Sequence, residues 1–183
     1  MTMFDSTAAG TLWGALFTAL LLAACATDIR TRRIPNTLVL AILGSGVAWS
    51  IATRPASAGL MASATGIGLG FAIWIGFWLA GVLGAGDVKF FAAIGAWLGP
   101  AATWRAALAA ALLGGVLALA TLVQARALGP ALRRLGLTLS AGTLAVLGHA
   151  GEAENAPTRH LPYGVALALG ALLVAWFPRL IPW

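Results

Sequence analysis

Long apolar stretches separated by short polar breaks run through nearly the whole chain. They lack the period-two alternation of membrane-barrel strands, so the pattern indicates helices. A helix needs about 20 apolar residues to cross a bilayer. Five stretches reach or approach that length, and a sixth is shorter and carries a lysine near its start. The expected spans are Gly10–Thr27, Thr37–Ala52, Ala58–Gly84, Val88–Trp104, Ala106–Ala125 and Leu161–Ile181.

The composition excludes an ordinary soluble domain. Of the 183 residues, 61% are hydrophobic and only 9% are charged, whereas soluble domains are about 25% charged. A soluble fold of this size could not cover so much apolar surface, and in lipid every backbone group must be paired internally. The predicted class is an all-α polytopic integral membrane protein with about six transmembrane helices, forming a single membrane-embedded domain over residues 1–183.

Two shorter features need separate interpretation. The segment Leu137–Ala150 is too short to cross a bilayer, so we expect it to be interfacial or packed within one long loop, 126–160. The run Leu22–Cys25 resembles a lipoprotein cleavage box. A signal peptide requires a positively charged N-terminal region, however, and the first 17 residues contain no Lys or Arg. A lone cysteine excludes an intramolecular disulfide and a four-cysteine zinc site, and Cys25 is expected to be a small buried residue of the first span.

Basic residues set the expected orientation, because Lys and Arg are enriched in cytoplasmic loops. Placing both termini outside leaves only Arg54, Arg105 and Arg179 on the outer side. The residues then facing the cytoplasm are Arg30, Arg32, Arg33, Lys89, Arg126, Arg133, Arg134 and Arg159. Most tryptophans fall near the expected outer ends, as an interfacial belt would: Trp13, Trp49, Trp97, Trp104, Trp176 and Trp183. Trp74 and Trp78 lie in the inner half of the third span, outside this belt.

The net charge of +6 does not indicate nucleic-acid binding, because the basic residues form no basic domain. The run Gly66–Gly70 also resembles part of a phosphate-binding loop, but no strand precedes it. Close helix packing through small residues is the better interpretation of Gly66, Gly70 and the pair Gly114–Gly115.

Only five residues are acidic. Asp5 lies in the N-terminal tail, and Glu152 and Glu154 lie in the polar loop, where solvated charge explains them. Asp28 and Asp87 each adjoin the end of an apolar span. A charge near membrane depth is costly, so these two residues are the candidates for function.

The interval between Asp28 and Asp87 is long enough for two membrane crossings. An even number of crossings returns the chain to the same face, so both aspartates are expected at one level. Two carboxylates in contact share a proton. One can then act as general base on a water molecule while the protonated partner polarises a carbonyl. Gly84 and Gly86 would loosen the helix end beside Asp87 and let another backbone approach, and Pro35 suits the first turn of the next helix.

The sequence resembles the bacterial type IV prepilin peptidases, peptidase family A24, which belong to the GxGD class of membrane aspartyl peptidases. Three motifs carry the resemblance, in order along the chain: Asp28 with Arg33–Asn36, then Gly84–Phe90, then Leu161–Gly164. The short architecture looks like the peptidases of tight-adherence (Flp-type) pilus systems.

The resemblance implies that Asp28 and Asp87 are the catalytic pair and that no cofactor or metal takes part. It implies supporting roles for Gly84, Gly86, Lys89, Arg33, Pro35, Asn36, Pro162, Tyr163 and Gly164. The substrate would be a prepilin or pseudopilin with a short basic leader and a hydrophobic helix. Cleavage would take place at the cytoplasmic face of the bacterial inner membrane, usually after a glycine. Longer members carry paired cysteines in an N-terminal region and N-methylate the product, so this chain is expected to lack methyltransferase activity and any separate methyltransferase or zinc domain.

Several alternatives stay open at this stage. The arginines at 30, 32 and 33 recognise substrate or simply anchor the chain, and Lys89 biases Asp87 electrostatically or extends to the interface. Tyr163 donates a hydrogen bond near the site or lies at the interface. His149 and His160 have no third ligand and do not indicate a metal site. The aspartates could also serve as the relay of a small proton-coupled transporter, and a non-catalytic subunit of a secretion assembly is a third possibility.

Overall fold

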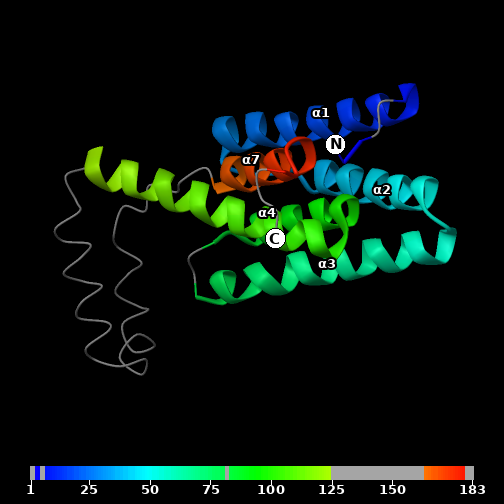
Figure 1. The fold of residues 1–183 in the computed structure, drawn as a ribbon. Helices are drawn as coiled ribbons and strands as arrows, with labels where there is room; N and C mark the ends of the chain where they lie inside the picture. Colours follow the sequence, from blue (N-terminus) through cyan, green and yellow to red (C-terminus); the bar gives the residue numbers. More distant parts are fainter. Residues whose placement is uncertain (1–2, 5–6, 81–82, 125–162, 180–183) are drawn as a thin grey trace. The chain divides into compact units, whose positions relative to one another are not determined.

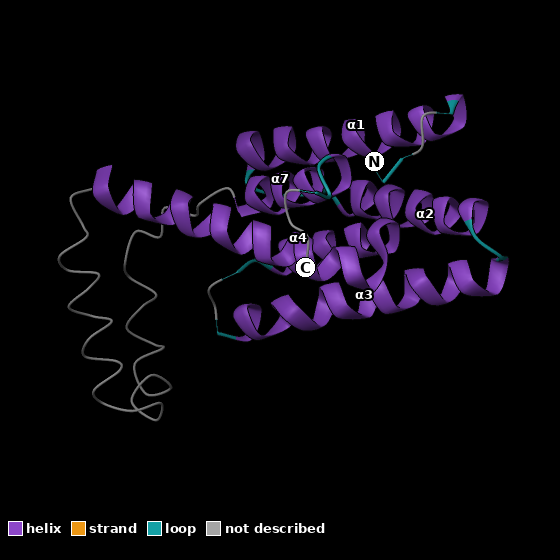
Figure 2. Ribbon diagram, in the orientation of Figure 1, coloured by secondary structure: helices purple, strands orange, loops and turns teal. Residues whose placement is uncertain are grey.

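The computed structural model describes the chain apart from residues 1–2, 5–6, 81–82, 125–162 and 180–183. Every regular element among the described residues is a helix (Figures 1 and 2), which confirms the predicted all-α class. The helices are α1 (Ala8–Thr31), α2 (Asn36–Thr53), α3 (Ala56–Leu79), α4 (Ala85–Gln124) and α7 (Tyr163–Trp176). The loop 126–160 and its segment Leu137–Ala150 lie outside the described residues.

Local sequence explains where the first three helices begin. The Thr7 side chain accepts a hydrogen bond from the Gly10 N–H at 3.1 Å and so caps α1. Pro35 and Pro55 stand immediately before α2 and α3. Proline lacks an N–H and its φ is fixed, so it fits a helix start at no loss of hydrogen bonding. Pro35 therefore precedes the first turn of α2, one position earlier than expected.

Four described helices are long and apolar enough to cross a membrane: α1, α2, α3 and α4; the apolar helix α7 is shorter. Large apolar side chains lie on the outer faces of these helices, including Leu12 at 71% exposure and Met61 at 66%. Such a surface is costly in water and natural in lipid. The chain is therefore a multi-pass membrane protein.

Clustering of the backbone divides the chain into two compact units. The first comprises residues 1–114 and 162–183, and the second comprises 115–161. In the second unit the structure describes only 115–124, the final part of α4. The first unit contains Asp28, Asp87 and α7, so the candidate chemistry lies within one unit.

Helix α4 reverses direction at Gly99, where the backbone is non-helical with φ 69° and ψ 174° (Figure 1). In one straight helix, Asp87 and Gly114 would lie about 40 Å apart. Yet Tyr163 interacts electrostatically with Asp87, and a Cβ at Gly114 would lie 2.6 Å from Tyr163 Cε2. The parts of α4 before and after Gly99 are therefore antiparallel segments as far as Gly114.

The predicted spans Val88–Trp104 and Ala106–Ala125 are thus separate, but the predicted boundary between them is wrong. The chain turns at Gly99–Pro100, because glycine accepts a positive φ and proline starts the second segment. Together with α1, α2, α3 and α7, the halves of α4 give six helical segments in the described part of the chain.

Pro100 leaves the carbonyl of Ala96 without the helical N–H that would normally reach it. Neighbouring helices replace that donor: Ser63 Oγ donates to Ala96 O at 2.9 Å, and Ser50 Oγ lies at 3.5 Å. Arg54 donates to Ser50 Oγ at 2.8 Å. Serine side chains often satisfy backbone groups freed by proline in membrane helices, so these residues stabilise the reversal of α4.

We expect Ser63→Ala to lower the free energy of unfolding by about 1–3 kcal/mol, because it leaves the buried Ala96 carbonyl with only the long bond from Ser50. Thermal unfolding in detergent micelles measures the loss. Ser45→Ala is the matched control, since Ser45 Oγ bonds only carbonyls of its own helix, and should change stability by less than about 0.5 kcal/mol. Equal effects of the two variants would contradict this role of Ser63.

Glycine contacts confirm most of the predicted close packing. Gly66 of α3 faces Gly95 of α4 so closely that a Cβ on either would overlap the other's carbonyl oxygen, and a Cβ at Gly70 would lie 3.0 Å from Phe91 O. A Cβ at Gly114 would overlap Tyr163, whereas a Cβ at Gly115 would meet no described residue within 4 Å. Gly115 does not share the contact of Gly114, because consecutive helical residues point about 100° apart.

The tryptophan belt is only partly correct. Trp49 and Trp97 are 5% and 0% exposed and belong to a buried aromatic cluster, whereas Trp104 is 50% exposed. The cluster joins helix ends that lie away from the aspartates and consists of Phe4, Trp13, Phe17, Trp49, Trp97 and Trp176. Position along a helix predicts depth but not whether a side chain faces lipid or protein.

Cys25, which was expected to be buried in the first span, is only partly buried.

Candidate active site

Asp28 lies one turn before the end of α1 and is 6% exposed. It faces the first turn of α7, where a Cβ at Gly164 would lie only 2.7 Å from Asp28 Oδ2. The backbone N–H groups of Gly164 and Val165 donate toward this carboxylate, whereas its Oδ2 has no hydrogen-bond partner among the described residues. The first N–H groups of a helix are unpaired and favour a negative charge. Asp28 therefore holds one carboxylate oxygen uncommitted.

The predicted Arg33–Asn36 motif forms the turn between α1 and α2. Arg32 ends α1 with a left-handed φ of 52°, and its N–H donates to Asp28 O at 2.8 Å. Ile34 is buried, and its Cδ1 would lie 3.1 Å from a Cβ at Gly164. Pro35 then starts α2. Through Ile34, the turn between α1 and α2 thus packs against Gly164, the residue that contacts Asp28.

Asp87 is the third residue of α4 and is half-buried. Its Oδ2 accepts from the Gly84 N–H at 3.3 Å, and its own N–H donates to Gly84 O at 3.1 Å. The Asp87 side chain therefore accepts from the N–H that precedes the helix, which corresponds to one half of a capping box. Neither Gly84 nor Gly86 has a positive φ, and a Cβ at Gly86 would meet nothing within 4 Å. Among the described residues, therefore, no atom would contact a side chain at position 86.

The two aspartates lie at the same end of the helices, as predicted. The charge of Asp28 acts on Asp87, and the charge of Asp87 acts on Tyr163, the neighbour of Gly164. Each carboxylate adjoins a helix N-terminus, α7 for Asp28 and α4 for Asp87. Two interacting carboxylates repel each other when both are ionised.

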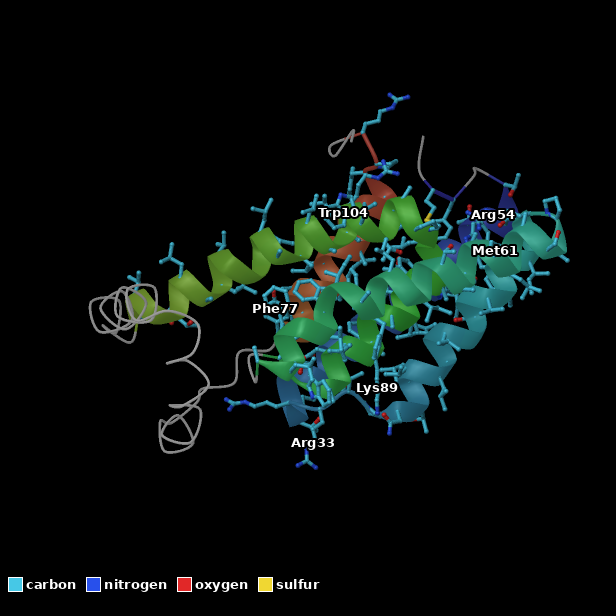
Figure 3. All side chains as sticks on the ribbon, turned by 90° about the horizontal axis from the view of Figure 1, so that it is seen from below. Arg33, Arg54, Met61, Phe77, Lys89 and Trp104 are labelled. Atoms are coloured by element: carbon cyan, nitrogen blue, oxygen red, sulfur yellow. The ribbon has the colours of Figure 1, made fainter. Side chains whose placement is uncertain are left out.

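The remaining predicted residues divide into two groups. Tyr163 is half-buried between Trp74 and Gly114, whereas Arg33, Asn36 and Lys89 are exposed. Figure 3 shows Arg33 and Lys89 at one end of the helices and Arg54 at the other. These exposed residues fit membrane anchoring better than direct contact with the aspartates. Pro162, His149 and His160 lie outside the described residues, and within the described ones no group of three His, Cys, Asp or Glu could hold a metal ion.

Sequence reasoning assigned no role at the site to Trp74, and it included Ile34 only as part of the Arg33–Asn36 motif. Trp74 is buried against Tyr163, with ring centroids 5.7 Å apart. The sequence did contain a signal for a role of Trp74, because this residue lies outside the expected tryptophan belt. Ile34 could be recognised only from the packing of α1 against α7, which local sequence does not specify.

Comparison with known proteins decides the family. The model of the type IV leader peptidase family matches residues 15–119, more than half of the chain and a stretch that includes both aspartates. The chain belongs to this family. A curated relative, the prepilin leader peptidase/N-methyltransferase of Pectobacterium carotovorum subsp. carotovorum, is 35% identical over 116 residues. The alignment covers 59% of this chain and 41% of the relative. No solved structure matches the chain.

Proposed function

We propose that this protein is a prepilin leader peptidase of the aspartic type. The observation that carries the proposal is the placement of Asp28 and Asp87 at one end of the helices, close enough for their charges to interact and each beside a helix N-terminus. Membership of the type IV leader peptidase family and the similarity to a prepilin leader peptidase support the substrate class. Asp28 and Asp87 are the proposed catalytic residues.

In the proposed reaction the dyad carries one proton before water attacks. The ionised carboxylate takes a proton from a water molecule, whose oxygen attacks the carbonyl carbon of the scissile peptide bond. The protonated carboxylate donates a hydrogen bond to the carbonyl oxygen and stabilises the charge that develops there. Proton transfer to the leaving nitrogen then breaks the C–N bond, giving a carboxyl group on the leader and an amine on the mature pilin.

The residues around the two aspartates support their proposed roles as general base and general acid. Backbone N–H groups donate to Asp28 from the first turn of α7 and to Asp87 from Gly84, which favours a defined orientation of each side chain. Asp28 Oδ2 is buried without a hydrogen-bond partner among the described residues, and we propose that water or substrate pairs with it when the prepilin binds. The open space at Gly86 lets an extended peptide backbone approach Asp87. Gly84, Gly86, Tyr163 and Gly164 are proposed as supporting residues.

The proposed location is the bacterial inner membrane, with the aspartates facing the cytoplasm and both termini in the periplasm. Basic side chains at the end of α1 and the start of α4 support this orientation by the positive-inside rule. The family resemblance implies a basic prepilin leader, which these basic side chains would repel. They are therefore proposed as membrane anchors rather than as substrate contacts. The single cysteine supports peptidase activity without the N-methylation that accompanies paired cysteines in longer members.

Co-expression of the chain with candidate small prepilins tests this function. Mass spectrometry of the membrane-embedded pilin should show loss of the leader, most often after a glycine, and an unmethylated new N-terminus. Pilins that keep their leaders beside a correctly inserted protein would contradict the proposal. Proton-linked solute uptake by vesicles without any cleavage would instead favour a transporter.

A further inference from the structure

Trp74 has a buried indole N–H without a hydrogen-bond partner among the described residues. Its side chain is 2% exposed. Two other tryptophans show how the chain pairs such groups: Trp97 Nε1 donates to Ile42 O at 2.8 Å, and Trp176 Nε1 donates to Thr18 Oγ1 at 3.1 Å. An unpaired donor in a buried site is costly and calls for an explanation.

The surroundings of Trp74 connect it to both aspartates. Its ring meets Phe91 edge-on at 5.7 Å, and Phe91 lies one turn after Asp87 on the same face of α4. It also meets Tyr163 edge-on at 5.7 Å, and Tyr163 directly precedes Gly164, which contacts Asp28. Phe77, labelled in Figure 3, packs against Trp74 from the same helix at 5.4 Å. Trp74 therefore contacts α4, which carries Asp87, and the first residue of α7, the helix whose N-terminus faces Asp28.

Packing alone does not account for a tryptophan at this position. The three ring contacts need an aromatic surface, which phenylalanine would supply without a polar atom to bury. A peptide that enters the site must be unwound before its carbonyl can reach the aspartates. Each carbonyl freed from the substrate helix then needs a new donor, because a backbone acceptor left unpaired in a buried site is costly. An unpaired donor of the protein and unpaired acceptors of the substrate complement each other.

We propose that Trp74 is a substrate-positioning residue whose indole N–H donates a hydrogen bond to a backbone carbonyl of the unwound prepilin segment. This inference rests on the proposed peptidase function and deepens it. The contact is to backbone, so it orients the peptide without selecting particular side chains. Its main effect is on binding of the extended segment rather than on the chemical step.

Two variants separate the N–H from the ring. Trp74→Phe removes the donor, and replacement of Trp74 by 3-benzothienylalanine exchanges the N–H for sulfur while keeping the ring size. Each should lower kcat/KM for prepilin cleavage about tenfold, mainly through KM, since one hydrogen bond is removed. The benzothienyl variant should keep the wild-type melting temperature. Unchanged kinetics in both variants would overturn the proposal.

The matched controls use Trp49, the other buried indole N–H without a described partner. Trp49 lies in the aromatic cluster away from the aspartates, stacked on Trp97 at 6.2 Å. Trp49→Phe and the benzothienyl substitution there should leave kcat/KM unchanged. A loss equal to that at Trp74 would show that the effect is structural, and the proposal would fail.

Indole ¹⁵N–¹H spectra of the Asp28→Asn protein provide a readout that does not depend on cleavage. Adding full-length prepilin should shift the Trp74 indole signal, identified by its absence in Trp74→Phe, while the Trp49 signal stays in place. A Trp74 signal that does not move would overturn the proposal. A shift in a protein whose wild type cleaves no prepilin would contradict the proposed peptidase function and leave the Trp74 contact standing.

Discussion

Replacing either Asp28 or Asp87 with asparagine is expected to reduce prepilin cleavage by at least about 10³-fold, because acid–base catalysis of this kind contributes about 10²–10⁴-fold and both groups act in one step. The double variant should be no slower than either single variant, since residues that act as a unit give non-additive losses. Cleavage of a co-expressed prepilin, followed by mass, measures the effect.

Folding and catalysis should separate in the Asp28→Asn protein. The amide side chain would keep one carbonyl oxygen for the N–H groups of Gly164 and Val165, and it would replace a buried carboxylate oxygen that has no partner among the described residues. The substitution also removes the repulsion between two interacting carboxylates, so the melting temperature should stay close to that of the wild type. Glu154→Gln is the charge-matched control and should cleave as wild type does. Efficient cleavage by Asp28→Asn or Asp87→Asn would rule out the dyad.

The level of the two aspartates could be predicted from sequence, because counting crossings fixes which end of a span a residue occupies. Counting crossings does not predict which side of a helix faces lipid and which faces the protein. Trp49 and Trp97 were placed at a plausible depth, but both turn inward to the aromatic cluster. In a helix that is apolar on every side, hydropathy does not distinguish a lipid-facing side chain from a protein-facing one. Only the packing of neighbouring helices decides.

The turn at Gly99 illustrates a second limit. The apolar stretch continues through Gly99–Pro100, so hydropathy placed the break several residues later, near Arg105. The structural signal is local chemistry: a glycine that can adopt a positive φ, followed by a proline that cannot continue the hydrogen-bond pattern. The compensating donor, Ser63, belongs to a different helix. The turn at Gly99–Pro100 could be predicted from the sequence, but the hydrogen bond from Ser63 that replaces the lost helical donor could not.

Contacts between distant segments were the least accessible part of the site. Gly164 was predicted to be a supporting residue only through resemblance, and the structure supplies a physical reason, since its missing Cβ leaves room for Asp28 Oδ2. That contact depends on α1 and α7 packing side by side, which the chain between them does not specify. The glycine is a spacer that lets a helix N-terminus approach a carboxylate.

Gly164→Ala should therefore lower the cleavage rate about 10²-fold while the protein remains folded. The added Cβ would lie 2.7 Å from Asp28 Oδ2 and 3.1 Å from Asp28 Cγ, so the carboxylate must move away from the α7 amides. A displacement of about 1 Å at a reacting group is enough for a loss of this size. Alanine is a better helix former than glycine, which offsets part of the steric cost. Rate and melting temperature, measured on the same preparation, give both quantities.

Gly68→Ala is the matched control, because a Cβ at Gly68 of α3 meets nothing within 4 Å. It should keep wild-type cleavage and full stability, and together the two variants distinguish a steric effect at Asp28 from a general response to alanine. Unimpaired cleavage by Gly164→Ala would mean that the position of Asp28 against α7 does not matter for catalysis. Loss of folding in Gly164→Ala, with Gly68→Ala unaffected, would make Gly164 primarily a packing residue. A slow but folded Gly164→Ala protein would instead indicate that the helix N-terminus positions the carboxylate for the reaction.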